Sequence, residues 1–315
     1  MRNEGSLGDL RSSKSRRRRT FDSFDGLSLV ADEWLAPAHT VSPPPAILLA
    51  HGGGQTRNAW KGTADKLSAH GWPVVSIDMR GHGESDWAPD ENYSIQAFAG
   101  DLLCVARNLD ASPIVVGASL GGIAAMFAHT EASSGRLPFS AMVLVDITPT
   151  IRADGVDKIR SFMREHLEEG FESLEEASKV ISAYMPGRAR PHDLSGLEKV
   201  LRQGRDGRYR WHWDPKFATG QRTPGHERAR YEVRLAELGG ALAELPVLLI
   251  RGRMSELVSE EDAQQFLKLV PHASYVDIAG AAHMVAGDRN DVFADALLSF
   301  VEDLDIKPEL TSERR

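Results

Sequence analysis

Short apolar runs alternate with helix-length segments along most of this chain of 315 residues. Runs such as Ile114 to Gly117 and Ala141 to Val145 are continuously apolar, without a polar residue at every second position. Strands of this kind are usually buried on both faces of a parallel sheet that helices cover. The sequence therefore predicts an α/β fold. The expected strands are 20–24, 27–34, 46–50, 74–78, 114–117, 141–145, 246–251 and 273–278, and the expected helices include 95–109, 120–129, 259–270 and 289–305.

The alternation breaks after Val145 into charged, helix-like sequence and resumes after Gly240. This interruption predicts an insertion in an otherwise continuous sheet. We expect a core formed by residues 20–146 and 241–305, with a cap formed by residues 147–240. Residues 1–19, which end in the run Arg16 to Arg19, are expected to be a disordered basic tail, and residues 306–315 a second tail.

Charge and composition exclude several function classes. The net charge is −8, and beyond residue 19 the chain holds 30 basic and 43 acidic residues, which disfavours a nucleic-acid partner. No apolar run approaches the ~18 residues of a membrane span. No apolar stretch follows the arginine run, which disfavours a twin-arginine export signal. Cys104 is the single cysteine and cannot form an intrachain disulfide. We expect a cytoplasmic protein with a small-molecule partner, and the sequence leaves its oligomeric state open.

The sequence Gly117-Ala118-Ser119-Leu120-Gly121 lies directly after one expected strand and directly before an expected helix. A sharp turn at this position exposes the serine hydroxyl, and glycines on both sides let neighbouring backbone pass close. The helix that follows directs free N–H groups at the same point. Ser119 is therefore the expected nucleophile.

A second turn, His51-Gly52-Gly53-Gly54, also follows a strand. Such a turn can present a bare backbone N–H to a developing negative charge. We expect the amides of Gly53 and Leu120 to form an oxyanion hole. The alternative is that this segment is only a flexible turn.

His283 lies in the loop after the last expected strand, at the sheet edge where open α/β sheets bind ligands. A serine at neutral pH needs an adjacent base, and histidine has the suitable pKa. His283 is therefore the expected general base, while most of the other histidines are expected to lie on the surface or to be structural.

These residues resemble the α/β-hydrolase family, from about Thr20 to Leu304. The segment Asp78-Met79-Arg80-Gly81-His82-Gly83-Glu84-Ser85 is similar to the family's turn after the fourth strand, which is usually structural, so His82 is expected to be a loop residue. The resemblance implies a mostly parallel eight-stranded sheet flanked by helices. It also implies a helical cap inserted after the sixth strand, and the chain order serine, acid, histidine.

The catalytic acid departs from the family's commonest pattern. At the usual place, the loop after the seventh strand, the sequence has Ser255 where an aspartate is expected, and Glu256 follows it. Glutamate is one methylene longer and can still accept the imidazole N–H, so Glu256 is the first choice. Some members of the family place the acid after the sixth strand, which makes Asp146 the alternative. Asp146 could also simply cap backbone donors.

The insertion contains a dense aromatic cluster that includes Tyr209, Trp211 and Trp213. These side chains could form an apolar roof over the site and contact substrate. They could equally well hold the cap elements to the core. Phe162, Met163, Tyr184 and Met185 could contribute to either arrangement.

Ser119 predicts acyl transfer, because family members that form an alkyl ester have an aspartate at the position of this serine. We expect a serine hydrolase without metal or cofactor that cleaves a carboxylic ester, lactone or thioester through an acyl-enzyme. A carbon–carbon bond hydrolase, a perhydrolase or an acyltransferase would use the same residues. A non-catalytic small-molecule receptor of the same fold is the alternative from another class.

Overall fold

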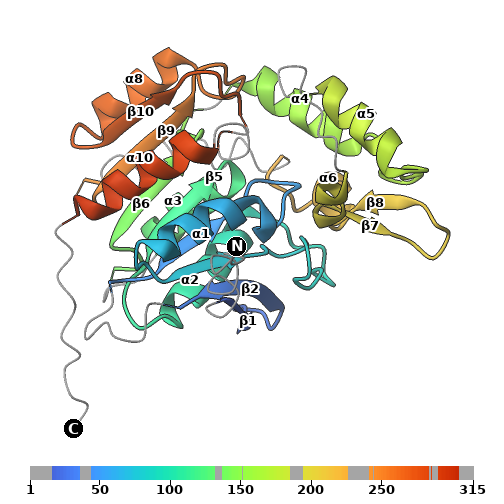
Figure 1. Ribbon diagram of the computed structural model, residues 1–315, viewed down its shortest axis with the longest axis horizontal. Helices are drawn as coiled ribbons and strands as arrows, with labels where there is room; N and C mark the ends of the chain where they lie inside the picture. The colour runs from blue at the N-terminus through green and yellow to red at the C-terminus, as the bar shows by residue number, and fades with distance from the viewer. Residues whose placement is uncertain are drawn as a thin grey trace, which may run out of the picture.

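An eight-stranded sheet forms the centre of the computed structural model (Figure 1). The structure describes residues 16–35, 44–131, 137–150, 152–184, 194–225, 241–243, 245–283, 285 and 290–304. The strand order is β1-β2-β4-β3-β5-β6-β9-β10. The strands are β1 (Arg16–Asp22), β2 (Ser28–Trp34), β3 (Ile47–Ala50), β4 (Val74–Ile77), β5 (Ile114–Ala118), β6 (Ala141–Val145), β9 (Val247–Gly252) and β10 (Ser274–Ile278).

Six of these strands run parallel, from β4 to β10 in the spatial order, while β1 and β2 are antiparallel to their neighbours. Strands β3, β4, β5, β6 and β9 are almost entirely buried, as their continuous apolar sequence predicts. The predicted α/β fold with a mostly parallel eight-stranded sheet is confirmed. The parallel arrangement brings the loops after β3, β5, β6, β9 and β10 to one edge of the sheet.

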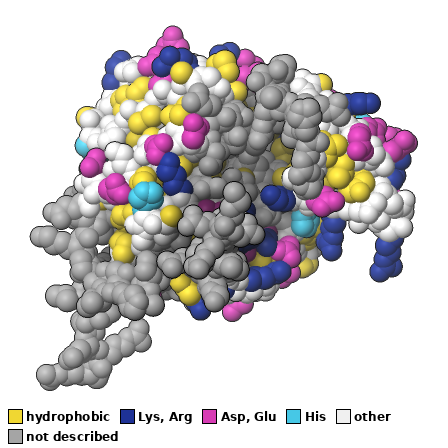
Figure 2. Space-filling model, in the orientation of Figure 1, with side chains coloured by type: hydrophobic (Ala, Val, Ile, Leu, Met, Phe, Trp, Pro, Cys, Tyr) yellow, Lys and Arg dark blue, Asp and Glu magenta, His cyan; other side chains and the backbone are white. Residues whose placement is uncertain are grey.

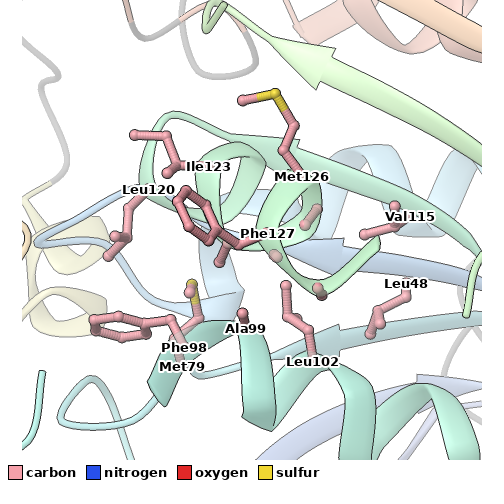
Figure 3. Close-up of a cluster of buried hydrophobic side chains, with 14 of the residues drawn as sticks. Leu48, Met79, Phe98, Ala99, Leu102, Val115, Leu120, Ile123, Met126 and Phe127 are labelled. Atoms are coloured by element: carbon pink, nitrogen blue, oxygen red, sulfur yellow. The ribbon is translucent and has the colours of Figure 1, made fainter. Parts of the chain in front are cut away.

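Helices cover both faces of the sheet and bury two hydrophobic cores. Leu48 faces one core with side chains of α2, α3 and α8, and Leu49 faces the other with side chains of α1 and α10. Figure 3 shows part of the first core, where α2 and α3 side chains meet those of β3 and β5. These helices are α1 (Lys61–Ala69), α2 (Ile95–Arg107), α3 (Leu120–Glu131), α8 (Glu260–Leu269) and α10 (Asn290–Glu302), and a 3-10 helix (Arg57–Trp60) precedes α1.

Two of these helices begin at serine caps. The Ser94 hydroxyl accepts a hydrogen bond from the Ala97 amide at the start of α2. At α8, Ser259 and Asp262 form a reciprocal capping box, as their spacing predicts. Each cap satisfies amides that have no partner inside the helix.

The N-terminal strand corrects the expectation of a disordered tail over residues 1–19. Arg16 to Arg19 belong to β1, which pairs in register with β2. Arg16 bonds Asp32 at 2.5 Å, Arg19 bonds Glu33 at 2.8 Å and Arg18 bonds Glu84 at 2.8 Å. The acidic partners neutralise the arginine run, so it can lie along a sheet. Residues 1–15 and 305–315 lie outside the described residues.

The insertion between β6 and β9 holds more than helices. Its helices are α4 (Ala153–Arg164), α5 (Leu174–Tyr184), α6 (Lys216–Thr219) and a 3-10 helix (Ser195–Lys199), and its strands are β7 (Leu201–Gln203) and β8 (Tyr209–Trp211). Strands β7 and β8 pair antiparallel. Asp206-Gly207 lies between them, with Gly207 at a φ of 79°. The expected helical insertion after the sixth strand is present, and this aspartate–glycine pair closes one small hairpin within it. Figure 1 shows these elements to one side of the main sheet.

Charges of both signs are mixed on the surface. Figure 2 shows Lys and Arg side chains interspersed with Asp and Glu over the face that it presents. Ion pairs such as Lys61–Asp65 and Lys66–Asp295 account for part of this mixing. Among the described residues, no helix has both the length and the hydrophobicity that a membrane span requires.

Candidate active site

Ser119 occupies a strained turn between β5 and α3. Its backbone φ is 48°, in the left-handed region that residues other than glycine rarely adopt. Its amide donates to the carbonyl oxygen of Val145 at 3.2 Å, which holds the turn against the end of β6. Strain of this kind persists only where the surroundings enforce it, and it is concentrated at functional sites. The sharp strand-to-helix turn that the sequence predicts at Ser119 is present.

Glycines let the backbone close around this turn. A Cβ on Gly117 would lie 2.5 Å from the amide nitrogen of Gly122, and a Cβ on Gly121 would lie 2.4 Å from the carbonyl oxygen of Ala50. Both distances are far below van der Waals contact. The glycines flanking Ser119 therefore allow α3 to start against the ends of β5 and β3.

Asp146 and His283 are hydrogen-bonded to each other. Asp146 follows β6 directly, has a φ of 51° and is fully buried. Its Oδ2 accepts a hydrogen bond from His283 Nδ1 at 2.7 Å. Ala118 pairs with Val145 in the β5–β6 register, so Ser119 and Asp146 follow at the same level of the sheet. The structure thus brings together the expected base and the alternative acid next to the expected nucleophile.

The loop after β9 supports this carboxylate. The Gly252 amide donates to Asp146 Oδ1 at 3.1 Å, and the Ser255 hydroxyl donates to Oδ2 at 2.5 Å. The Ser255 oxygen in turn accepts the amides of Leu257 and Val258. Ser255, at the position where the family usually has aspartate, therefore contacts Asp146 from the loop after the neighbouring strand β9. Sequence reasoning assigned Ser255 no role, although its place in that loop was the available signal.

Glu256, the first choice for the acid, does not bond His283. Its carboxylate is about half exposed and pairs with Lys158 of α4 at 2.5 Å. A Cβ on Gly155 would lie 2.4 Å from the Glu256 carbonyl oxygen, which shows how closely α4 covers this residue. The ion pair of the Glu256 carboxylate is therefore with the insertion, through Lys158. The geometry favours Asp146 in its place.

The glycine loop, Gly52–Gly54, lies against the turn that carries Ser119. A Cβ on Gly52 would be 3.5 Å from Ser119 Cβ, and one on Gly53 would be 3.9 Å from Leu120 Cδ2. Gly52 donates its amide to Gln55 Oε1 at 3.0 Å, and Gly54 donates its amide to His82 Nε2 at 3.1 Å.

The Gly53 and Leu120 amides have no hydrogen-bond acceptor within the described part of the chain. These are the two donors that the sequence predicts for an oxyanion. The geometry leaves both amides available next to Ser119.

Two buried histidines support the glycine loop. His51 Nδ1 donates to the Gly52 carbonyl and its Nε2 accepts the Met79 amide, while His82 Nδ1 donates to the Arg80 carbonyl. Burial lowers the pKa of His51 to about 4 and that of His82 to about 3, and the backbone carbonyl at each Nδ1 opposes the shift. Both rings are therefore neutral at pH 7, with the proton on Nδ1.

The aromatic residues predicted to contact substrate separate into two groups. Trp213 is buried beside the glycine loop, with its Nε1 3.7 Å from a Cβ placed on Gly54. Tyr209 and Trp211 pack in a small core of the insertion around Phe171, and the Trp211 ring also stacks on that of Trp213, with the ring centres 6.5 Å apart. For these two, the packing interpretation is favoured.

Phe217 and Met163 also reach the glycine loop. Phe217 Cζ would lie 3.2 Å from a Cβ on Gly53, and Met163 Cε 3.1 Å from a Cβ on Gly54. The sequence did not single out Phe217, whose short helix α6 carries no catalytic motif. Phe162 stacks on Tyr184 with the ring centres 4.0 Å apart, while Met185 lies outside the described residues. Apolar side chains of the insertion thus cover one side of this loop.

Within the described ranges, no group of three or more His, Cys, Asp or Glu side chains is placed to hold a metal ion. Cys104 lies in α2, and burial raises the pKa of its thiol, which makes it a poor nucleophile. The chemistry that these residues can perform is nucleophilic attack by a serine with histidine as base.

Known proteins share this architecture. The chain is 28% identical to a 3-hydroxybutyrate-oligomer hydrolase of Cupriavidus necator, over 80% of this chain and 85% of the relative. It is 29% identical to an esterase of Mycobacterium tuberculosis, over 78% of each chain. An α/β hydrolase of Novosphingobium aromaticivorans has a similar solved structure, with a TM-score of 0.76, 23% identity and coverage of 90% and 98% of the two chains. A family model described as alpha/beta hydrolase fold matches residues 45–289. The chain therefore belongs to the α/β-hydrolase family, as its motifs predict.

Proposed function

We propose that this α/β hydrolase is a serine hydrolase that cleaves a carboxylic ester, lactone or thioester through an acyl-enzyme on Ser119. The observation that carries the proposal is the hydrogen bond from His283 to the buried Asp146, at the edge of the sheet where Ser119 occupies its strained turn. A carboxylate on Nδ1 fixes the imidazole tautomer and leaves Nε2 free to accept a proton.

In the proposed reaction, Ser119 Oγ attacks the substrate carbonyl while His283 Nε2 takes the hydroxyl proton. Asp146 stabilises the imidazolium that forms, and the Gly53 and Leu120 amides bind the oxyanion. His283 then returns the proton to the leaving group, which leaves the acyl group on Ser119. Water, activated by the same histidine, hydrolyses the acyl-enzyme and regenerates the serine. No step needs a group from outside the chain except substrate and water.

The relatives favour an ester bond over a carbon–carbon bond. One is named an esterase and another an oligomer hydrolase, and the chain aligns with most of the length of both. An apolar wall formed by Trp213, Phe217 and Met163 beside the glycine loop suits an acyl or alcohol group without charge.

The test is fluorophosphonate labelling followed by intact-mass spectrometry, together with hydrolysis of a series of p-nitrophenyl esters. We expect one label on the wild-type protein, none on Ser119→Ala, and ester turnover that is lost with the same substitution. Labelling of Ser119→Ala at another residue, or a folded wild-type protein that is neither labelled nor active, would contradict the proposal. The second result would favour a small-molecule receptor.

A further inference from the structure

His82 lies outside the proposed triad, yet its ring holds part of the proposed oxyanion hole. The side chain is fully buried, and its two ring nitrogens have different partners. Nδ1 donates to the Arg80 carbonyl at 2.9 Å, which fixes the tautomer. Nε2 is then an acceptor, and it receives the Gly54 amide at 3.1 Å.

This bond matters because three consecutive glycines form a very flexible segment. Gly52 and Gly54 both donate their amides to side chains, Gln55 and His82 respectively. The Gly53 amide between them is one of the two proposed oxyanion donors. The Gly53 N–H belongs to the peptide group between Gly52 and Gly53, whose carbonyl oxygen accepts from His51 Nδ1 and from the Gln55 amide, while the bond from Gly54 to His82 holds the next peptide group. Holding the peptide groups on both sides of Gly53 orients its N–H before the oxyanion forms, which is what electrostatic preorganisation requires.

The insertion in turn holds His82. The Gly83 amide donates to the His212 carbonyl at 2.7 Å, and the Asp214 amide donates to the Gly81 carbonyl at 2.7 Å. These two bonds enclose His82 and form an antiparallel bridge between it and Trp213.

Phe217 completes this contact. Its ring meets the His82 ring edge to face, with the ring centres 4.7 Å apart, and it also covers Gly53. The segment from residue 212 to 217 therefore contacts both His82 and the glycine loop that His82 supports.

We propose that His82 is a positioning residue that links the insertion to the glycine loop and fixes the Gly53 amide as an oxyanion donor; this rests on the proposed function of that loop. His82 touches neither Ser119 nor substrate in this mechanism. It acts through a neutral Nε2 that accepts the Gly54 amide, so a residue with an acceptor at the same reach can replace it.

Two substitutions distinguish the need for a hydrogen-bond acceptor at position 82 from the need for a side chain that merely fills the space. In His82→Gln the Oε1 atom is as many bonds from Cα as Nε2 and can accept the Gly54 amide. In His82→Asn the acceptor is one methylene shorter and cannot reach it. The matched control is His129→Gln, because His129 is also buried but bonds Ala241 elsewhere in the fold.

The readouts are kcat and KM for a p-nitrophenyl ester, the inhibition constant of an alkylboronic acid that mimics the tetrahedral intermediate, and the melting temperature. We expect His82→Asn to lower kcat and weaken boronate binding by about tenfold or more, with little change in KM. His82→Gln should recover most of both. His129→Gln should leave both unchanged even if it lowers the melting temperature. Equal kcat and boronate affinity in wild type and folded His82→Asn would overturn the proposal.

A measurement on the wild-type protein keeps the test decisive if the variants do not fold. Scalar coupling across the hydrogen bond between the nitrogen-15 nuclei of Gly54 and His82 Nε2 should be observable. A protonated Nε2, or the absence of this coupling, would refute the positioning role. This measurement needs no substrate, so an inactive wild-type protein would refute the proposed function and leave the result on His82 standing by itself.

Discussion

Replacing Asp146 with asparagine tests the proposed triad most directly. The carboxylate accepts three hydrogen bonds, from the Gly252 amide, the Ser255 hydroxyl and His283 Nδ1. Asparagine has one acceptor oxygen and one donor NH₂ group. If its oxygen keeps the Gly252 amide, its NH₂ group faces His283 Nδ1–H, and two donors oppose each other. The imidazole then favours the tautomer with the proton on Nε2, which cannot accept the Ser119 proton.

The expected loss follows from that tautomer change. In the serine protease triad the same substitution lowers kcat by about 10⁴-fold, which corresponds to about 5.5 kcal/mol of transition-state stabilisation. Asparagine tolerates the positive φ of Asp146 better than most residues, so the backbone adds little to the effect. We therefore expect a folded Asp146→Asn protein with kcat about 10⁴-fold below wild type.

Glu256→Gln is the matched control. The Lys158–Glu256 pair is about half exposed on both sides, and exposed pairs contribute about 0–1 kcal/mol to stability. We expect kcat of Glu256→Gln to stay close to wild type. The assay is steady-state ester hydrolysis and the rate of fluorophosphonate labelling, with circular dichroism to confirm folding. A large loss in Glu256→Gln, together with near-normal activity in folded Asp146→Asn, would refute the assignment and restore the acid to the loop after β9.

Three further predictions concern the surroundings of this site. Ser255→Ala removes one hydrogen bond to Asp146, so kcat should fall by about two- to tenfold at nearly unchanged KM; an unchanged kcat would deny Ser255 any influence on the acid. Gly121→Ala places a Cβ 2.4 Å from the Ala50 carbonyl oxygen and should lower the free energy of unfolding by about 1–3 kcal/mol in urea titrations, whereas Gly196→Ala, with nothing within 4 Å, should not. His51 and His82 have pKa values lowered to about 4 and about 3, so the unfolded chain binds more protons than the native state below about pH 6.5. Stability should therefore fall from pH 7 to pH 5 by about 1–2 kcal/mol per histidine, and an equal urea midpoint at both pH values would contradict neutral burial.

Most of the main sheet could be predicted from the sequence. The buried parallel strands are mostly continuous apolar runs, such as Ile114–Val116 of β5. Asp25-Gly26, between the expected strands 20–24 and 27–34, is a two-residue hairpin signal, and β1 and β2 do pair antiparallel around it. Local chemistry was sufficient in these segments because each one carries its own burial pattern or turn residue.

Two segments needed information that lies elsewhere in the chain. Four consecutive arginines indicate a solvated arm when considered alone, and only the facing Asp32 and Glu33 allow them to form a strand. The small hairpin in the insertion has a local turn signal, Asp206-Gly207, but its two strands are three-residue segments that carry no continuous apolar pattern and need the partner strand to be defined.

The position of the acid depends on contacts that no local pattern contains. Asp146 and Glu256 both follow strands whose ends lie at the same edge of the sheet, so spacing alone allows either. What separates them is the positive φ that buries the Asp146 carboxylate against His283, and the α4 helix that draws Glu256 into a surface ion pair. The loop after β9 thereby contacts the insertion through Glu256 and the proposed acid through Ser255. These two contacts are made by adjacent residues, and the Leu257 carbonyl also accepts the Arg152 amide at the start of α4, so this short segment connects α4 with the residues that support Asp146.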